Sequence, residues 1–349
     1  MTTQTIQITQ ITQITQITQA PCNLARPDSA EKIKIGISAC LLGQEVRFDG
    51  GHQRDNYITD VLGKYFTYIP LCPEVAIGLG VPRSSLRLIS FSKDISNPQA
   101  IMPKTDKNHT AELQEFARIS APKLDKISAY IFKKKSPSCG LERVKIYSPE
   151  GMPMGHGMGI YAKELTSHLP LLPMEEEGRL YDLGLRENFI KRVYLYSEWQ
   201  KLCEVGLDFQ GLLKFHTRHK LLLIAHHYGN SKLLGKFIAN LDPHIDHAGF
   251  LEIADQYIRL FMQTIKKIPA RRHHGQVLER IMVRINQHLE SKQKEDLLKL
   301  IQEYLSGSVP LSIPIRMIRH YLTAFDEPNL EIQSYLNPYP EDLGLMNGI

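Results

Sequence analysis

Two patterns of apolar residues divide this chain near residue 170 and limit the folds open to it. In the first part, short apolar runs rich in β-branched residues alternate with stretches of helical periodicity. Such alternation is typical of βαβ units, which build a mostly parallel sheet. Five runs are predicted to be strands: residues 32–38, 67–71, 86–91, 127–132 and 144–147. Helical periodicity marks residues 110–124 and 162–169.

From Leu183 onward, apolar residues recur every three or four positions without β-branched alternation. This pattern predicts roughly 5–8 helices of ordinary length. The predicted fold class is therefore α/β: a Rossmann-like, mostly parallel sheet domain, followed by a separate all-α helical domain. The predicted divisions are a disordered tail of Ile-Thr-Gln repeats at 1–30, the α/β domain at 31–170, a linker at 171–190, the helical domain at 191–330 and a C-terminal extension at 331–349.

The charge and cysteine content restrict the compartment and the partners. The 42 basic and 37 acidic residues give a net charge of +5, scattered along the chain, which permits a nucleic-acid partner without arguing for one. Five cysteines, an odd number in a long chain, indicate a reduced, cytoplasmic protein. No apolar run is long enough to cross a membrane, and no secretory signal pattern is present. The sequence leaves a homodimer open.

Three cysteines stand in short motifs where predicted strands end: Cys40, Cys72 and Cys139. Strand ends of an α/β fold meet at one crevice, so these thiols are expected to lie together. The alternative is that each is a small buried apolar residue. Structural zinc usually shows paired Cys-x-x-Cys or histidine spacings, which this domain lacks. A disulfide would leave one thiol over. An iron–sulfur cluster with one open iron fits this set better.

Glu74 and two serines accompany these cysteines. Glu74 follows Cys72 across a proline, where its carboxylate can serve as a general acid or base beside a metal. The alternative is that Glu74 stabilises the first turn of a short helix. Ser136 and Ser138 flank a proline just before the third cysteine. They can bind substrate or cluster sulfur, or they are ordinary turn residues.

Basic and histidine-rich segments supply further candidates. Loops after the first two cysteines carry Arg47, Asp49, Arg54, Arg83 and Arg87, which can bind an anionic or carbonyl-bearing ligand or be surface charges. In the helical part, His216, His219, His226 and His227 fall within a sector of about 100° on a helix. A metal site is one reading of this face, and a polar stripe at a domain interface is the favoured one.

Several of these motifs occur together in a known family. Residues 33 to about 165 resemble the thiouracil desulfurase family, also called domain of unknown function 523. The motifs are Ser38-Ala-Cys40-Leu-Leu-Gly43, Arg47-Phe-Asp-Gly50, Cys72-Pro-Glu74, Gly80-Val-Pro-Arg83 and Lys135-Ser136-Pro-Ser-Cys139-Gly140. Residues from about 190 to 310 resemble the YbgA-like helical family, domain of unknown function 1722, on Phe215-His-Thr-Arg-His219-Lys220 and Ala225-His226.

The resemblance implies an enzyme that removes sulfur, as hydrosulfide, from thiolated nucleobases such as 2-thiouracil. It implies a [4Fe–4S] cluster held by Cys40, Cys72 and Cys139, with one open iron acting as a Lewis acid. Glu74 would then be the catalytic acid or base, Ser136 a supporting residue, and the partner a small thiocarbonyl substrate. One alternative is a non-catalytic iron–sulfur sensor with the helical domain as output, which requires a fourth ligand such as Cys203. Another is a zinc-binding or metal-free binding module.

Overall fold

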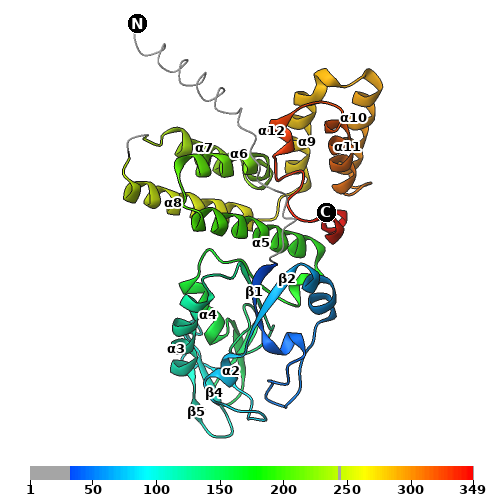
Figure 1. Ribbon diagram of the computed structural model, residues 1–349. Coiled ribbons are helices and arrows are strands. Elements are labelled where there is room, and N and C mark those ends of the chain that lie inside the picture. The colour runs from blue at the N-terminus through cyan, green and yellow to red at the C-terminus, as the bar shows by residue number, and fades with distance from the viewer. Residues whose placement is uncertain (1–31, 243–244, 349) are drawn as a thin grey trace. The chain divides into compact units, whose positions relative to one another are not determined.

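The computed structural model describes residues 32–242 and 245–348. The predicted tail, with Cys22, lies outside the described residues. Within them, all strands precede Glu177, and helices follow from Leu183 onward, as the apolar patterns predict (Figure 1). None of the helices described is long and apolar enough to cross a membrane.

The first sheet places three strand ends at one edge. Its strand order is β2-β1-β6-β9, and all three pairings are parallel. The strands are β1 (Ile33–Ser38), β2 (Phe66–Leu71), β6 (Ala129–Phe132) and β9 (Met174–Glu176). Because β1 pairs with both β2 and β6 in parallel, the carboxyl ends of these three strands are neighbours.

Side chains of β6 alternate between two cores, one on each face of this sheet. Ala129 and Ile131 belong to a core that includes Phe189 and Val193 of α5 (Leu183–Glu204). Tyr130 and Phe132 belong to a second core with residues of α3 (Thr110–Ser120) and α4 (Ile160–His168). Buried on both faces, β6 reads as a continuous apolar run, as strands of parallel sheets do. Helix α5 therefore covers one face of the sheet.

A second sheet was not predicted. Its order is β5-β4-β3-β7-β8, and only the β3–β7 pairing is parallel. Its strands are β3 (Arg87–Ile89), β4 (Gln99–Met102), β5 (Lys107–Asn108), β7 (Val144–Tyr147) and β8 (Pro153–Gly157). Strand β8 lies within the glycine-rich residues 151–159, where the sequence predicts no strand. Strand β8 is rich in glycine and is ordered by backbone pairing to β7. Its sequence therefore has no alternation of apolar residues from which a strand could be predicted.

From Leu183 onward the described residues form eight α-helices, in agreement with the predicted number, together with short 3₁₀ turns. After α5 these are α6 (Phe209–His226), α7 (Tyr228–Ala239), α8 (His247–Lys266), α9 (Arg271–Ile285), α10 (Ser291–Ser306), α11 (Ser312–Leu322) and α12 (Pro328–Glu331). Aspartate side chains accept a backbone hydrogen bond at the starts of α5, α6 and α8, which satisfies a donor that the helix itself leaves free.

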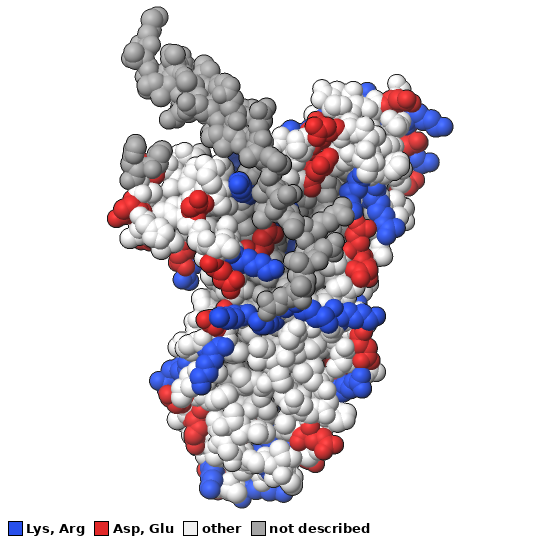
Figure 2. Space-filling model, in the orientation of Figure 1, with Lys and Arg blue, Asp and Glu red and all other residues white. Residues whose placement is uncertain are grey.

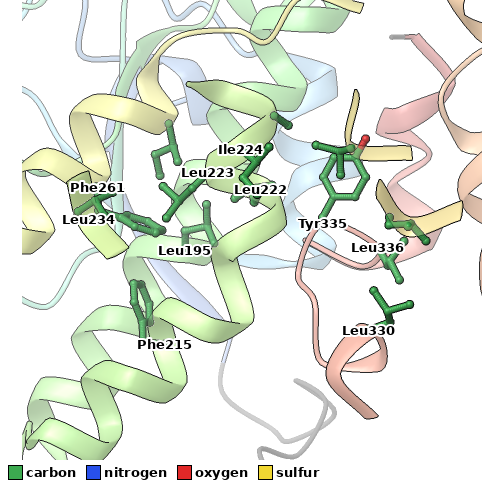
Figure 3. Close-up of a cluster of buried hydrophobic side chains, with 14 of the residues drawn as sticks. Leu195, Phe215, Leu222, Leu223, Ile224, Leu234, Phe261, Leu330, Tyr335 and Leu336 are labelled. Carbon is green, nitrogen blue, oxygen red and sulfur yellow. The ribbon is translucent and has the colours of Figure 1, made fainter. Parts of the chain in front are cut away.

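The helical region has its own apolar core, part of which Figure 3 shows. Leu195 of α5, Phe215 of α6 and Phe261 of α8 contribute to it. Trp199, the only tryptophan of the chain, packs edge-on against Phe215 in the same core. On the face shown in Figure 2, basic and acidic side chains lie on both the α/β part and the helical part.

Candidate functional site

The three cysteines of the predicted site follow the three neighbouring strand ends. Cys40 lies in the 3₁₀ turn Ala39–Leu42 that directly follows β1. Cys72 follows β2 and precedes the short helix α2 (Pro73–Ala76). Cys139 lies in the loop after β6. The parallel pairing of these strands brings together three thiols that are far apart in sequence, as the motifs predict.

All three cysteines line one cavity of about 690 Å³, a volume in the usual range for small-molecule sites. Glu74, Ser136 and Ser138 line the same cavity. Its wall is strongly basic, and the basic side chains are Arg47, Arg83, Arg87, Lys133, Lys134, Lys135, Arg143, Lys145 and His156. The sequence drew attention only to the first three of these as ligand-binding candidates. Arg54 does not line the cavity and instead pairs with Asp60.

Burial keeps these thiols protonated in the absence of a bound cation. It raises the pKa of Cys40 to about 11, and Lys133 nearby acts in the opposite direction. Burial also raises the pKa of Cys72 and of Cys139, and a charge on Cys72 raises the pKa of Cys139 further. A metal that binds a thiol displaces its proton, so three thiols that line one cavity are suited to a soft metal group.

Glu74 is held by two donors from other parts of the chain. Ser138 Oγ donates a hydrogen bond of 2.6 Å to Glu74 Oε1. Arg83 Nε and Nη2 lie 2.9 and 2.8 Å from Glu74 Oε2, and this ion pair is largely buried. Arg83 in turn donates to the carbonyl oxygens of Val46 and Gly80. Glu74 stands in the first turn of α2, but its side chain bonds to Arg83 and Ser138 rather than capping that helix.

The two serines form a short hydrogen-bonded chain with Glu74. Ser136 Oγ lies 3.0 Å from Ser138 Oγ, which reaches Glu74. Ser136 Oγ also accepts the backbone N–H of Cys139 at 3.1 Å, a turn contact that orders the cysteine loop. Ser138 is fully buried. Sequence reasoning placed Ser136 in the site and gave Ser138 no distinct part, whereas the direct contact to Glu74 comes from Ser138.

Two glycines allow the chain to pass close to this loop. A Cβ on Gly159 would come within 2.6 Å of the Ser138 carbonyl group, and one on Gly140 within 2.4 Å of a Val144 methyl. Gly159 N donates to Gly140 O at 2.7 Å, which joins the two segments. The glycine-rich run before α4 thus ends in a residue that packs directly on the cysteine loop.

The four candidate histidines of the helical region have structural partners. Buried His216, His219 and His226 bond through Nδ1 to Tyr257 Oη, Ser334 Oγ and the Lys267 carbonyl oxygen. His227 lies at the end of α6 and accepts the Asn230 N–H at the start of α7. The first three therefore lie inside the helical region, where these partners cover them, whereas the favoured interpretation was a polar stripe at a domain interface. The sequence showed a shared helical face but not that helices and loops cover it.

Other metal arrangements find less support. Within residues 32–242 and 245–348, no group of three or more His, Cys, Asp or Glu side chains is arranged to hold one metal ion. Cys203, the fourth ligand that a saturated cluster would need, is exposed and does not line the cavity.

Comparisons with known proteins match both parts of the chain. Residues 35–177 match the family model described as 2-thiouracil desulfurase, and residues 220–340 match that described as protein of unknown function (DUF1722). The chain is 28% identical over 158 residues to the uncharacterized protein YbgA of Escherichia coli (strain K12), covering 44% of this chain and 89% of YbgA. A solved structure of the [4Fe–4S]-dependent thiouracil desulfidase TudS is 30% identical and covers 44% of this chain and 97% of that one, with a TM-score of 0.35.

Proposed function

We propose that this chain, whose residues 35–177 belong to the 2-thiouracil desulfurase family and whose residues 220–340 belong to the DUF1722 family, is a [4Fe–4S]-dependent desulfurase. Its substrates would be thiolated nucleobases of the 2-thiouracil type. The observation that carries the proposal is the meeting of three thiols, those of buried Cys40 and Cys139 and half-buried Cys72, with the Glu74 carboxylate at one cavity.

Cys40, Cys72 and Cys139 are the residues that would hold the cluster. In a cluster each thiolate binds its own iron, so the three sulfurs need not meet at one ion. The absence of a single-ion site among the described residues is compatible with such spacing. The bound cluster would supply one open iron as a Lewis acid with affinity for the substrate sulfur.

The net reaction exchanges sulfur for oxygen without any change of oxidation state. Water adds its oxygen to the thiocarbonyl carbon, the carbon–sulfur bond breaks, and carbonyl product and hydrogen sulfide result. Both protons of the attacking water leave its oxygen before the carbonyl forms, and both end on the departing sulfur as hydrogen sulfide. The reaction therefore needs a group that takes up and returns a proton beside the reacting carbon.

Glu74 is positioned for that proton transfer. Arg83 and Ser138 hold its two carboxylate oxygens in place. The distance from the carboxylate to a bound substrate then varies little. The hydroxyl groups of Ser138 and Ser136 extend from Glu74 along the loop of the third cysteine and can pass a proton along that line. Basic side chains around the cavity stabilise negative charge that develops on the leaving sulfur.

The test is anaerobic reconstitution of the full chain with iron and sulfide, followed by incubation with 2-thiouracil. We expect release of one sulfide for each uracil formed. Glu74→Gln should keep its iron and lose sulfide release, whereas Glu115→Gln, which changes an exposed ion pair on α3, should match the unaltered protein. Full turnover in Glu74→Gln would refute the assigned role, and a chain that binds no iron would refute the cluster.

A further inference from the structure

A run of three glutamates, Glu175 to Glu177, lies beside the candidate site although the sequence places it in a linker. Glu175 and Glu176 belong to β9, which pairs in parallel with β6 so that Glu176 stands opposite Phe132. All three side chains are buried, with exposed fractions of 7%, 6% and 4%. Charged residues are rarely buried without partners, so their contacts show what they do.

Glu177 contacts the beginning of the loop that carries Ser136 and Cys139. Its Oε1 forms an ion pair with Lys133 Nζ, and its Oε2 accepts the Lys134 backbone N–H at 2.7 Å. The Glu177 N–H donates to the Phe132 carbonyl oxygen at 3.1 Å. The carboxylate therefore fixes the backbone at the point where β6 ends.

Glu176 contacts the other end of the same loop. Its Oε1 accepts the backbone N–H groups of Leu141 and Glu142, at 2.8 and 3.1 Å. These two donors follow Cys139 by only two and three residues in the chain. Without Glu176, both would lose a charged acceptor in a half-buried place, which is a costly change.

The backbone next to these contacts is strained. Lys135 and Arg143 have φ angles of 60° and 55°, in the left-handed region that side chains other than glycine rarely adopt. Each is the residue immediately after an N–H that a glutamate accepts, namely those of Lys134 and Glu142. Strained conformations persist only where surrounding contacts hold them.

We propose that Glu176 and Glu177 are positioning residues that hold the two ends of the Lys134–Glu142 loop and so set the places of Ser136 and Cys139. The inference rests on the proposed function only for the roles of Ser136 and Cys139 in the reaction, not for how the glutamates hold the loop. It assigns the glutamates no contact with substrate or cluster. Glu175 is the natural contrast, because its side chain pairs with Arg179 and accepts no N–H of the loop.

The test measures alkylation of Cys139 by iodoacetamide in the full-length, iron-free chain, read by mass spectrometry, with buried Cys40 as the internal reference. Buried thiols react when the structure opens locally, so the rate reports how firmly the loop is held. In Glu176→Ala we expect Cys139 to react at least about tenfold faster, because two half-buried donors lose their acceptor, while Cys40 is unchanged. Glu175→Ala should leave the Cys139 rate as it is.

Glu176→Gln keeps a carbonyl acceptor and loses the charge, so its Cys139 rate should fall between those of the unaltered chain and Glu176→Ala. This variant also decides the matter if Glu176→Ala does not fold. Glu177→Ala should also raise the alkylation rate of Cys139. Cys40 is not a reference for this variant, because Lys133, the partner of Glu177, also acts on the Cys40 thiol.

An unchanged Cys139 rate in the Glu176 variants would overturn the proposal, and so would an equal rise at Cys139 and Cys40, which indicates general destabilisation. Alkylation of iron-free protein involves no sulfide release. The alkylation test can therefore refute the positioning role while sulfide release still supports the desulfurase. Loss of sulfide release can likewise refute the desulfurase while the positioning role holds.

Discussion

Ser138 Oγ donates a 2.6 Å hydrogen bond to Glu74 Oε1, which ties the loop of the third cysteine to the residue two positions after the second. The two residues are separated by 64 positions in the chain. The bond places a carboxylate, a hydroxyl and two of the candidate ligands on one continuous wall of the cavity.

Removing this hydroxyl should slow the proposed reaction without removing the metal group. A hydrogen bond to a charged group contributes about 1.5–3 kcal/mol, so Ser138→Ala is expected to lower the rate of sulfide release roughly 10- to 100-fold. The iron content should be unchanged, because the assigned ligands are the cysteines. Ser120→Ala, which deletes a buried hydroxyl on α3, is the matched control and should retain full activity. Equal activity in both variants would contradict the assigned contact.

The Arg83–Glu74 ion pair should matter to stability as well as to activity. The exposed fractions of the two side chains are only 4% and 12%, and removing one member of a buried pair costs about 3–5 kcal/mol. Arg83→Met is expected to lower the free energy of unfolding by about that amount, measured by urea unfolding with far-ultraviolet circular dichroism. Arg54→Met breaks the exposed pair with Asp60 and should cost less than about 1 kcal/mol. A similar decrease in the free energy of unfolding in both variants would show that burial does not make the Arg83–Glu74 pair more stabilising than the exposed pair.

The assigned ligands should be distinguishable from other cysteines by iron analysis. Changing Cys40, Cys72 or Cys139 singly to serine is expected to lower the iron and sulfide retained after anaerobic reconstitution and gel filtration, because a hydroxyl is a poorer ligand for soft iron. Cys203→Ser should bind iron as the unaltered chain does, since Cys203 is exposed and outside the cavity. Iron loss in Cys203→Ser would favour a saturated cluster and hence a sensor.

The sequence could predict the site where local patterns determine it. Each cysteine motif follows a short apolar run, and the rule that parallel strand ends converge was enough to bring the three thiols together. The contact between Ser138 and Glu74 had no local signal, because it depends on how two loops from different strands pack. Ser136 and Ser138 look equivalent in the sequence, and only burial and direction separate them.

The acidic run at residues 175–177 shows where sequence reasoning stops. Three consecutive glutamates near two prolines are typical of an exposed connection, and the sequence was interpreted as a linker. Their burial depends on a lysine and three backbone N–H groups that lie 34 to 44 residues earlier in the chain. Charges that have such partners can be buried in an edge strand, but no local sequence pattern predicts these partners. The histidines of α6 are a parallel case, since their covering residues come from α8 and the C-terminal segment.

The buried histidines of the helical region should make its stability depend on pH. Burial lowers the pKa of His216 to about 4 and that of His274 to about 3, and it lowers the pKa of His226 well below its usual value. In the unfolded chain these groups have a pKa of about 6.5. Between that value and the folded pKa the unfolded chain binds more protons, so the free energy of unfolding must fall as pH decreases below about 6.5.

Trp199 allows this dependence to be measured in the helical region itself, because it is the chain's only tryptophan and lies in that core. Each such histidine contributes up to about 1.4 kcal/mol per pH unit, so the urea midpoint from Trp199 fluorescence should fall clearly between pH 7 and pH 5.5. His216→Gln removes one titrating group that faces Tyr257 and should reduce that slope while lowering stability at pH 7. A midpoint independent of pH across this interval would mean that these histidines are protonated, or exposed, in the folded protein.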